Sequence, residues 1–181
     1  MAGEIREMHE CSSTTRQEFI ATIEKPYHYA DCGLPNIYLV GVRQFQCECG
    51  EKAVEIPAIK QLMALIARHL AMKNASLTGL EIKFLRKQLG QRANDFAEHV
   101  KLQPETLSRI ENGKQSVGEK TDVYIRIYYA LESKDPVLMD ALKSALDRVL
   151  SAHRTKAPKK PPKTVATIEH DKWAMAANAG R

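Results

Sequence analysis

Residues 93–113, ANDFAEHVKLQPETLSRIENG, are the stretch of sequence that decides the fold. Apolar side chains recur in it at the spacing of two short helices: Phe96, Ala97, Val100, Leu107 and Ile110. Proline is favoured at the first position of a helix, so Pro104 marks the start of the second one. Two helices joined by a short turn cross at about 90 to 120°, and Ala97 supplies the small residue that their close approach needs. The stretch therefore predicts a helix-turn-helix.

The flanking segments extend this motif to a domain of residues 76–132. Thr78 and Glu81 have the spacing of a capping box, in which each side chain satisfies a backbone N–H at the start of a helix. Apolar residues then follow at helical spacing up to Gly90, where the helix is expected to stop. Beyond the motif, an apolar stripe over residues 123–131 predicts a further helix that covers the bundle, and Leu102 is expected to be the buried residue of the turn.

The run TLSRIENGK at residues 106–114 closely resembles the phage-repressor family of helix-turn-helix domains, also called Xre-type. The resemblance covers about 55 residues, and it implies that the helix from Pro104 lies in the major groove of DNA. The alternative is a plain helical hairpin without a role on DNA. A glutamate at position 111 suits a buried or capping role better than a place beside a phosphate, so Glu111 is expected to be structural.

The resemblance also implies which side chains contact DNA. The residues expected near the base edges are Gln103, Glu105, Thr106 and Arg109. The residues expected close to backbone phosphates are Arg92, Asn94, Ser108, Asn112, Lys114 and Ser116. A guanidinium can hold the two acceptors of guanine at once, so Arg109 is the strongest candidate for base recognition. Each of these residues could instead belong to an ordinary surface.

The N-terminal part has a different character from the helical part. Residues 25–57 contain short strand-like runs broken by turn residues, and a β-rich module of this size buries too little apolar surface to fold without a metal or a neighbour. The chain has four cysteines, Cys11, Cys32, Cys47 and Cys49. In a reducing compartment, metal binding or free thiols are commoner than disulfides.

This module, read together with the helix-turn-helix, resembles the YgiT-type zinc-finger regulators, which include MqsA-like antitoxins. The residues that carry the likeness are YHYADCGLPNIYL at 27–39, CECGE at 47–51 and LTG at 77–79. It implies an N-terminal module that faces a toxin or another partner, and one structural Zn²⁺. The candidate ligands are His28, Cys32, Cys47 and Cys49. The usual two Cys-x-x-Cys knuckles are missing, so the alternative is a degenerate finger with free thiols.

The rest of the chain connects or flanks these two modules. Residues 58–75 predict a connecting helix, and residues 133–153 predict a C-terminal helix that starts at Asp135-Pro136, where a capping carboxylate precedes a proline. Residues 1–24 are expected to be a flexible arm. Residues 154–181 are expected to be a basic flexible tail, in which Trp173 could anchor a partner. The fold class expected from all this is mainly α with a small N-terminal β module.

Composition restricts the function. The formal net charge of +5 weakly favours an anionic partner, and neither a membrane span nor a secretory signal is apparent, so we expect a cytoplasmic, nucleoid-associated protein. The six histidines are scattered without a catalytic spacing, which argues against an enzyme.

We therefore expect a DNA-binding transcriptional repressor. It would act as a homodimer on a palindromic operator and regulate its own operon as the antitoxin of a type II toxin-antitoxin pair. The alternatives are a stand-alone phage or mobile-element regulator and a protein-interaction adaptor.

Overall fold

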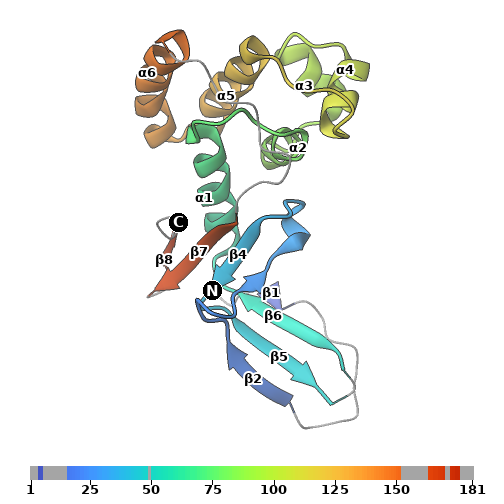
Figure 1. Ribbon diagram of the computed structural model, residues 1–181, viewed down its shortest axis with the longest axis vertical. Helices are drawn as coiled ribbons and strands as arrows, with labels where there is room; N and C mark the ends of the chain where they lie inside the picture. The colour runs from blue at the N-terminus through green and yellow to red at the C-terminus, as the bar shows by residue number, and fades with distance from the viewer. Residues whose placement is uncertain (1–3, 6–15, 49, 152–162, 170–171, 176–181) are drawn as a thin grey trace. The chain divides into compact units, whose positions relative to one another are not determined.

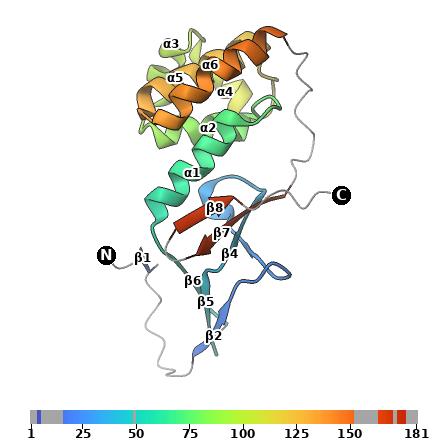
Figure 2. The same cartoon turned by 90° about the vertical axis from the view of Figure 1, so that its left-hand side faces the viewer.

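The computed structural model describes residues 4–5, 16–48, 50–151, 163–169 and 172–175. The chain forms two compact units, one of residues 1–65 with 162–181 and one of residues 66–161. Figures 1 and 2 show their elements from two directions. Within the described ranges, no helix has the length and apolar character that a membrane crossing requires.

The first unit contains two four-stranded sheets. One sheet has the order β1-β6-β5-β2, built from β1 (Glu4–Ile5), β2 (Arg16–Ile20), β5 (Arg43–Cys47) and β6 (Lys52–Ile56), with all pairs antiparallel. The other has the order β3-β4-β7-β8, built from β3 (Tyr27–His28), β4 (Ile37–Val40), β7 (Thr164–Glu169) and β8 (Lys172–Met175). A short 3₁₀ helix, η1 (Ala30–Cys32), joins β3 to the approach of β4.

The parallel pairing of β4 with β7 joins an early and a late strand of the chain in one sheet (Figure 2). Leu39 and Ala166 are opposite each other in this pairing and are fully buried. At the start of the pairing, the amide of Asn36 donates to the Thr164 hydroxyl at 3.2 Å. Gly41, at φ +86°, follows β4 where the Ile168 backbone comes close, since an added Cβ would lie 2.9 Å from the Ile168 carbonyl oxygen.

Trp173 of β8 completes the core of this unit. Its side chain is buried among the apolar residues of the unit, and its indole N–H donates to the Pro57 carbonyl oxygen at 2.9 Å. The fully buried apolar side chains here include Leu34, Ile37, Leu39, Val42 and Leu62. This hydrogen bond satisfies the indole N–H, which needs a partner when a tryptophan is buried.

These sheets correct the expected fold class. A mainly α chain with a small N-terminal β module is wrong, because the fold is a mix of α and β with two sheets. The segment expected to be a basic tail contributes β7 and β8, and the segment expected to be a flexible arm contributes β1 and β2. The physical reason is that β7 is stabilised by pairing with β4, which lies far from it in the sequence. No turn connects the two strands, so the residues of β7 do not indicate this pairing.

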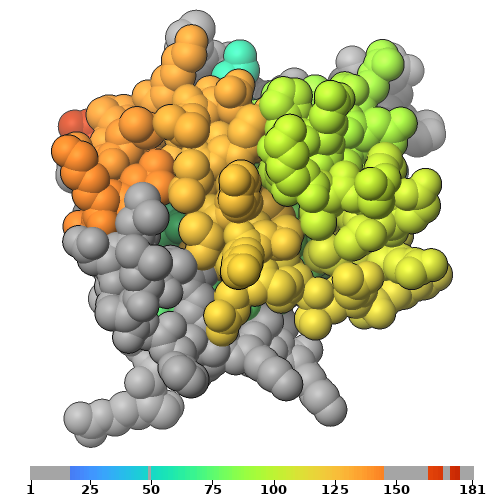
Figure 3. All heavy atoms as spheres, turned by 90° about the horizontal axis from the view of Figure 1, so that it is seen from above, coloured from blue at the N-terminus to red at the C-terminus, as the bar shows by residue number. Residues whose placement is uncertain are grey.

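The second unit is a helical bundle. Its helices are α2 (Gly79–Gln88), α3 (Ala93–His99), α4 (Pro104–Glu111), α5 (Glu119–Ser133) and α6 (Pro136–Ser151), together with the second half of α1 (Ile59–Met72). α5 lies between α6 on one side and the pair α3 and α4 on the other (Figure 3). The fully buried core includes Ile82, Leu85, Phe96, Leu107 and Ile125.

The helix starts expected from the sequence are present. Thr78 and Glu81 form both hydrogen bonds of the capping box at the start of α2. At the start of α6, Oδ1 of Asp135 accepts from the backbone N–H of Val137 at 2.9 Å, and its other carboxylate oxygen accepts from Arg68.

Candidate nucleic-acid interface

The expected DNA-contacting residues lie on the surface of α4 and of the segments on either side of it. Leu107, Ile110 and Glu111 of α4 are buried against the bundle. The exposed residues of the expected set are Arg92, Asn94, Gln103, Glu105, Ser108, Arg109, Asn112, Lys114 and Ser116, whereas Thr106 is half-buried. The structure therefore brings nine of these ten residues to the surface of one helix-turn-helix.

The turn between α3 and α4 is tight. Ala97 is fully buried, and its carbonyl oxygen accepts from the backbone N–H of Leu102 at 2.8 Å. Lys101 has φ +57°, the left-handed conformation that non-glycine residues adopt at a cost. Leu102 is half-buried rather than buried as expected. The small side chain at position 97 lets the turn close directly over α3.

The C-terminal end of α4 packs on the start of α2 at very short range. A Cβ built on Gly79 would lie 1.9 Å from the carbonyl oxygen of Ile110. No side chain fits there, so glycine is required by the approach of the two backbones. This contact fixes the position of α4 along its axis relative to α2.

A largely buried ion pair fixes the same end of α4. Arg86 Nε and Nη2 donate to the two carboxylate oxygens of Glu111 at 2.7 and 2.8 Å, while Arg86 Nη1 donates to the Gln91 carbonyl oxygen at 2.9 Å. The hydrogen bond to Glu111 raises the pKa of the Arg86 guanidinium. The bidentate geometry resists rotation as well as translation of α4, which confirms the structural role expected for Glu111.

The end of α4 uses three of the expected phosphate-contacting residues, Ser108, Asn112 and Lys114, in its own termination. The Asn112 amide donates to the Ser108 carbonyl oxygen at 2.8 Å, and the Lys114 backbone N–H donates to the Arg109 carbonyl oxygen at 2.8 Å. Gly113 has φ +70°, as the residue that closes a helix often does. This backbone hydrogen bond thus fixes the position of Lys114 beside the end of α4.

Tyr128 of α5 holds α3 in place. Its ring is stacked with that of His99 at 5.0 Å between centroids and meets the edge of Phe96 at 5.7 Å. The Gln91 amide donates to the Tyr128 hydroxyl. Since Gln91 also accepts from Arg86, the segment that leads into α3 is bound both to α5 and to the ion pair under α4.

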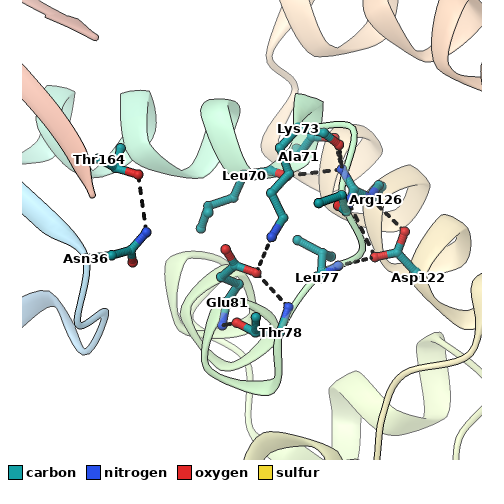
Figure 4. A network of polar contacts seen from close by, with 11 residues as sticks. Asn36, Leu70, Ala71, Lys73, Leu77, Thr78, Glu81, Asp122, Arg126 and Thr164 are labelled. Carbon is teal, nitrogen blue, oxygen red and sulfur yellow. Dashed lines mark hydrogen bonds and ion pairs between the residues drawn. The ribbon is translucent and has the colours of Figure 1, made fainter. Parts of the chain in front are cut away.

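The sequence analysis missed a buried polar network within this bundle. Arg126 Nη1 donates to the carbonyl oxygens of Leu70, Ala71 and Lys73, and its Nη2 donates to that of Ala75, all within 3.1 Å (Figure 4).

Asp122 completes this network on the same helix. Its carboxylate accepts from Arg126 Nε at 3.0 Å and from the Leu77 backbone N–H at 2.8 Å. The network thereby satisfies the carbonyls at the end of α1 and fixes residues 73–77, from which α2 starts. The i, i+4 spacing of the pair on a helix was the signal available in the sequence.

The expected zinc ligands are not brought together among the described residues. His28 Nε2 is 2.9 Å from the Pro35 carbonyl oxygen, and the Cys32 thiol donates to the Tyr29 carbonyl oxygen at 3.0 Å. Cys47 is buried in β5, in a different sheet from His28, and Cys49 lies outside the described residues.

The described ranges contain no group of three histidine, cysteine or acidic side chains able to hold a metal. In the described residues, the His28 ring and the Cys32 thiol are within hydrogen-bonding distance of carbonyl oxygens of their own module, and burial raises the pKa of the Cys32 thiol.

Comparisons with known proteins identify no relative of this chain, because no family model, no curated protein and no solved structure matches it.

Proposed function

We propose that the protein is a sequence-specific DNA-binding transcriptional repressor that inserts α4 into the major groove of its operator. The observation that carries the proposal is the division of α4 into a buried apolar face and an exposed polar face that includes Glu105 and Arg109. A helix held rigidly at the surface with an exposed face of this kind fits the width of the major groove.

Charge and rigidity support the same role. Exposed cationic side chains on and around the helix-turn-helix include Lys87, Arg92, Lys101, Arg109 and Lys114. Such residues neutralise phosphates and release counterions, which supplies sequence-independent affinity. The Arg86–Glu111 pair and the Gly79–Ile110 contact keep α4 in one place, so little ordering is needed when DNA binds.

A titration of fluorescent DNA from upstream of its own gene tests the proposal. The chain and its Arg109→Ala variant are compared by anisotropy at several salt concentrations. We expect tight binding by the chain, with the logarithm of the affinity falling by about 0.9 per neutralised phosphate for each unit of log salt.

The Arg109→Ala variant should bind at least about tenfold more weakly. Lys25→Ala, which removes one exposed charge in the β-rich unit, is the matched control and should bind as the unmodified chain does. If the affinity for DNA changes neither with salt concentration nor in Arg109→Ala, the protein-interaction adaptor is favoured instead.

The repressor is proposed to be a homodimer, since one helix reads too few base pairs for useful affinity on its own. Exposed apolar side chains on α5 and α6 support a contact between copies: Tyr124, Leu131, Val137 and Met139. Light scattering of the protein with and without operator measures this. Two chains per duplex are expected, and one chain per duplex would contradict it.

The antitoxin role is proposed for the β-rich unit. Its edge strand β2 exposes Phe19 and Ile20, and Ile23 follows with 58% exposure. An exposed apolar edge is where another protein adds contacts. Co-expression with the product of the adjacent gene tests the role: a stable complex is expected, and its loss on changing Ile20 and Ile23 to Ser locates the interface. Without such a complex, the stand-alone regulator replaces the antitoxin.

A further inference from the structure

Glu105 and Arg109 lie on the side of α4 that faces away from the bundle. The three buried side chains of α4 centre on one direction around the helix axis, and at about 100° per residue Glu105 is almost diametrically opposite that centre. Arg109 follows about one turn later, and it lies within about 30° of the direction opposite to the centre of the buried side chains. Both side chains are exposed, and among the residues that the structure describes neither has a side-chain partner.

A carboxylate in this place is unusual for a surface that faces DNA. Phosphates repel it, so it weakens binding unless it accepts hydrogen bonds from a base. The donors on the major-groove edge are the N4 amino group of cytosine and the N6 amino group of adenine. Adenine also carries the N7 acceptor beside its amino group, which repels a carboxylate, whereas cytosine has no acceptor on that edge.

Cytosine is therefore the base that a carboxylate reads best, and guanine is the base that a guanidinium reads best. Residues four apart in a helix are separated by about 6 Å along its axis, which spans about two base-pair steps of 3.4 Å. The two side chains of α4 can thus contact neighbouring base pairs at the same time.

We infer that Glu105 determines specificity by reading a cytosine, one or two base pairs from the guanine that Arg109 reads. The inference rests on the proposed function and defines the class of half-site that α4 recognises. Glu105 contributes by discrimination rather than by affinity, because guanine and thymine leave its carboxylate desolvated and unpaired, and adenine places its N7 acceptor beside it.

Selection of bound duplexes from a random double-stranded library tests this. The chain, Glu105→Gln, Arg109→Ala and the control Glu132→Gln are selected in parallel at one salt concentration. Glu132 is exposed on α5, so its variant removes the same charge away from α4. Because Glu105 is also exposed, its substitution leaves the folded core intact, which the thermal unfolding curve of each variant verifies.

We expect the chain and the control to select the same half-site, containing a cytosine and a guanine one or two steps apart. A glutamine reads adenine with two hydrogen bonds, so Glu105→Gln should change that cytosine to adenine by about tenfold or more and leave other positions unchanged. Arg109→Ala should lose the guanine.

Two other outcomes overturn the inference, and they are distinguishable. If Glu105→Gln selects the same base as the chain, Glu105 does not read that position, and the proposed function stands without it. If the unmodified chain enriches no sequence at all, the proposed function fails and the inference fails with it.

Discussion

The backbone of Gly79 at the start of α2 lies directly against the carbonyl group of Ile110 near the end of α4, with no space for a side chain between them. Gly79→Ala should therefore separate the two helices and lower the free energy of unfolding by about 1–3 kcal/mol, the usual cost of overpacking. Chemical denaturation measures it.

Gly118→Ala is the control for this variant, because nothing lies within 4 Å of the Cβ that it adds. It should cost less than about 1 kcal/mol, through the weaker N-cap of α5. Equal losses in the two variants would contradict the close packing.

The turn at Lys101 offers a stabilising change. A left-handed residue with a side chain costs about 1–2 kcal/mol, which exceeds the about 0.5–1 kcal/mol of additional chain entropy that glycine loses on folding. Lys101→Gly should thus raise the free energy of unfolding by up to about 1 kcal/mol. Lys87→Gly, in the regular helix α2, should instead lower it by about 1 kcal/mol. A loss of stability in both variants would show that the turn does not favour glycine.

The buried Arg126 should not tolerate lysine. A lysine has one ammonium group in place of the planar fork that reaches four carbonyl oxygens and Asp122. Arg126→Lys should lose about 2–4 kcal/mol of the free energy of unfolding, since breaking buried charge networks costs this much or more. The exposed Arg109→Lys is the control, expected to change stability by less than about 0.5 kcal/mol. A similar result for both would mean that the network adds nothing to stability.

The lowered pKa of His69 predicts that the free energy of unfolding depends on pH. Its burial in α1 lowers the pKa of the imidazole, and the nearby carboxylate of Glu81 opposes this only in part. The unfolded chain therefore binds a proton more readily than the folded one. This contribution to stability is complete above about pH 6.5 and is lost as the pH falls through the folded-state pKa.

Urea denaturation at several pH values between 8 and 5, about the range in which histidine changes charge, measures this contribution. The free energy of unfolding should fall toward acid pH in the unmodified chain and fall less in His69→Asn. Parallel profiles for the two proteins would exclude His69 as the cause.

The burial of Trp173 predicts that β8 stabilises the β-rich unit. Trp173→Phe keeps much of the ring but removes the hydrogen bond to Pro57 and leaves a small cavity, so we expect a loss of about 1–3 kcal/mol. Hydrogen exchange measured by mass spectrometry should show faster exchange in β4 and β7 and unchanged exchange in α2 to α5. Lys172→Ala, at an exposed position of the same strand, should alter neither region.

The parts of the fold that sequence reasoning predicted are those fixed by neighbours in sequence. The capping box at Thr78, the helix start at Asp135 and the small residue at Ala97 all act within a few positions, and each is where it was expected. The candidate DNA-contacting set came from the resemblance to the phage-repressor family, and nine of its ten residues are exposed.

The missed features depend on contacts between distant segments. β7 is paired with β4, and the residues of neither strand specify the other. Arg126 was hidden because a charged residue on an amphipathic helix is normally on the solvent side, whereas here the free carbonyls at the end of α1 provide it with acceptors. The zinc site stays a prediction, since one of its four candidate ligands lies outside the described residues.

The order of synthesis gives the β4–β7 pairing a kinetic consequence. Asn36 and Thr164, which begin it, are 128 positions apart. At about 5–20 residues per second, the ribosome takes about 6 to 26 seconds to cover that distance. All of α2 to α6 is synthesised in this interval, so the helical bundle can fold while the edge of β4 still lacks its neighbour. During every round of translation, the helices of the bundle are therefore synthesised before β7 and β8, the strands that complete the sheet around Trp173.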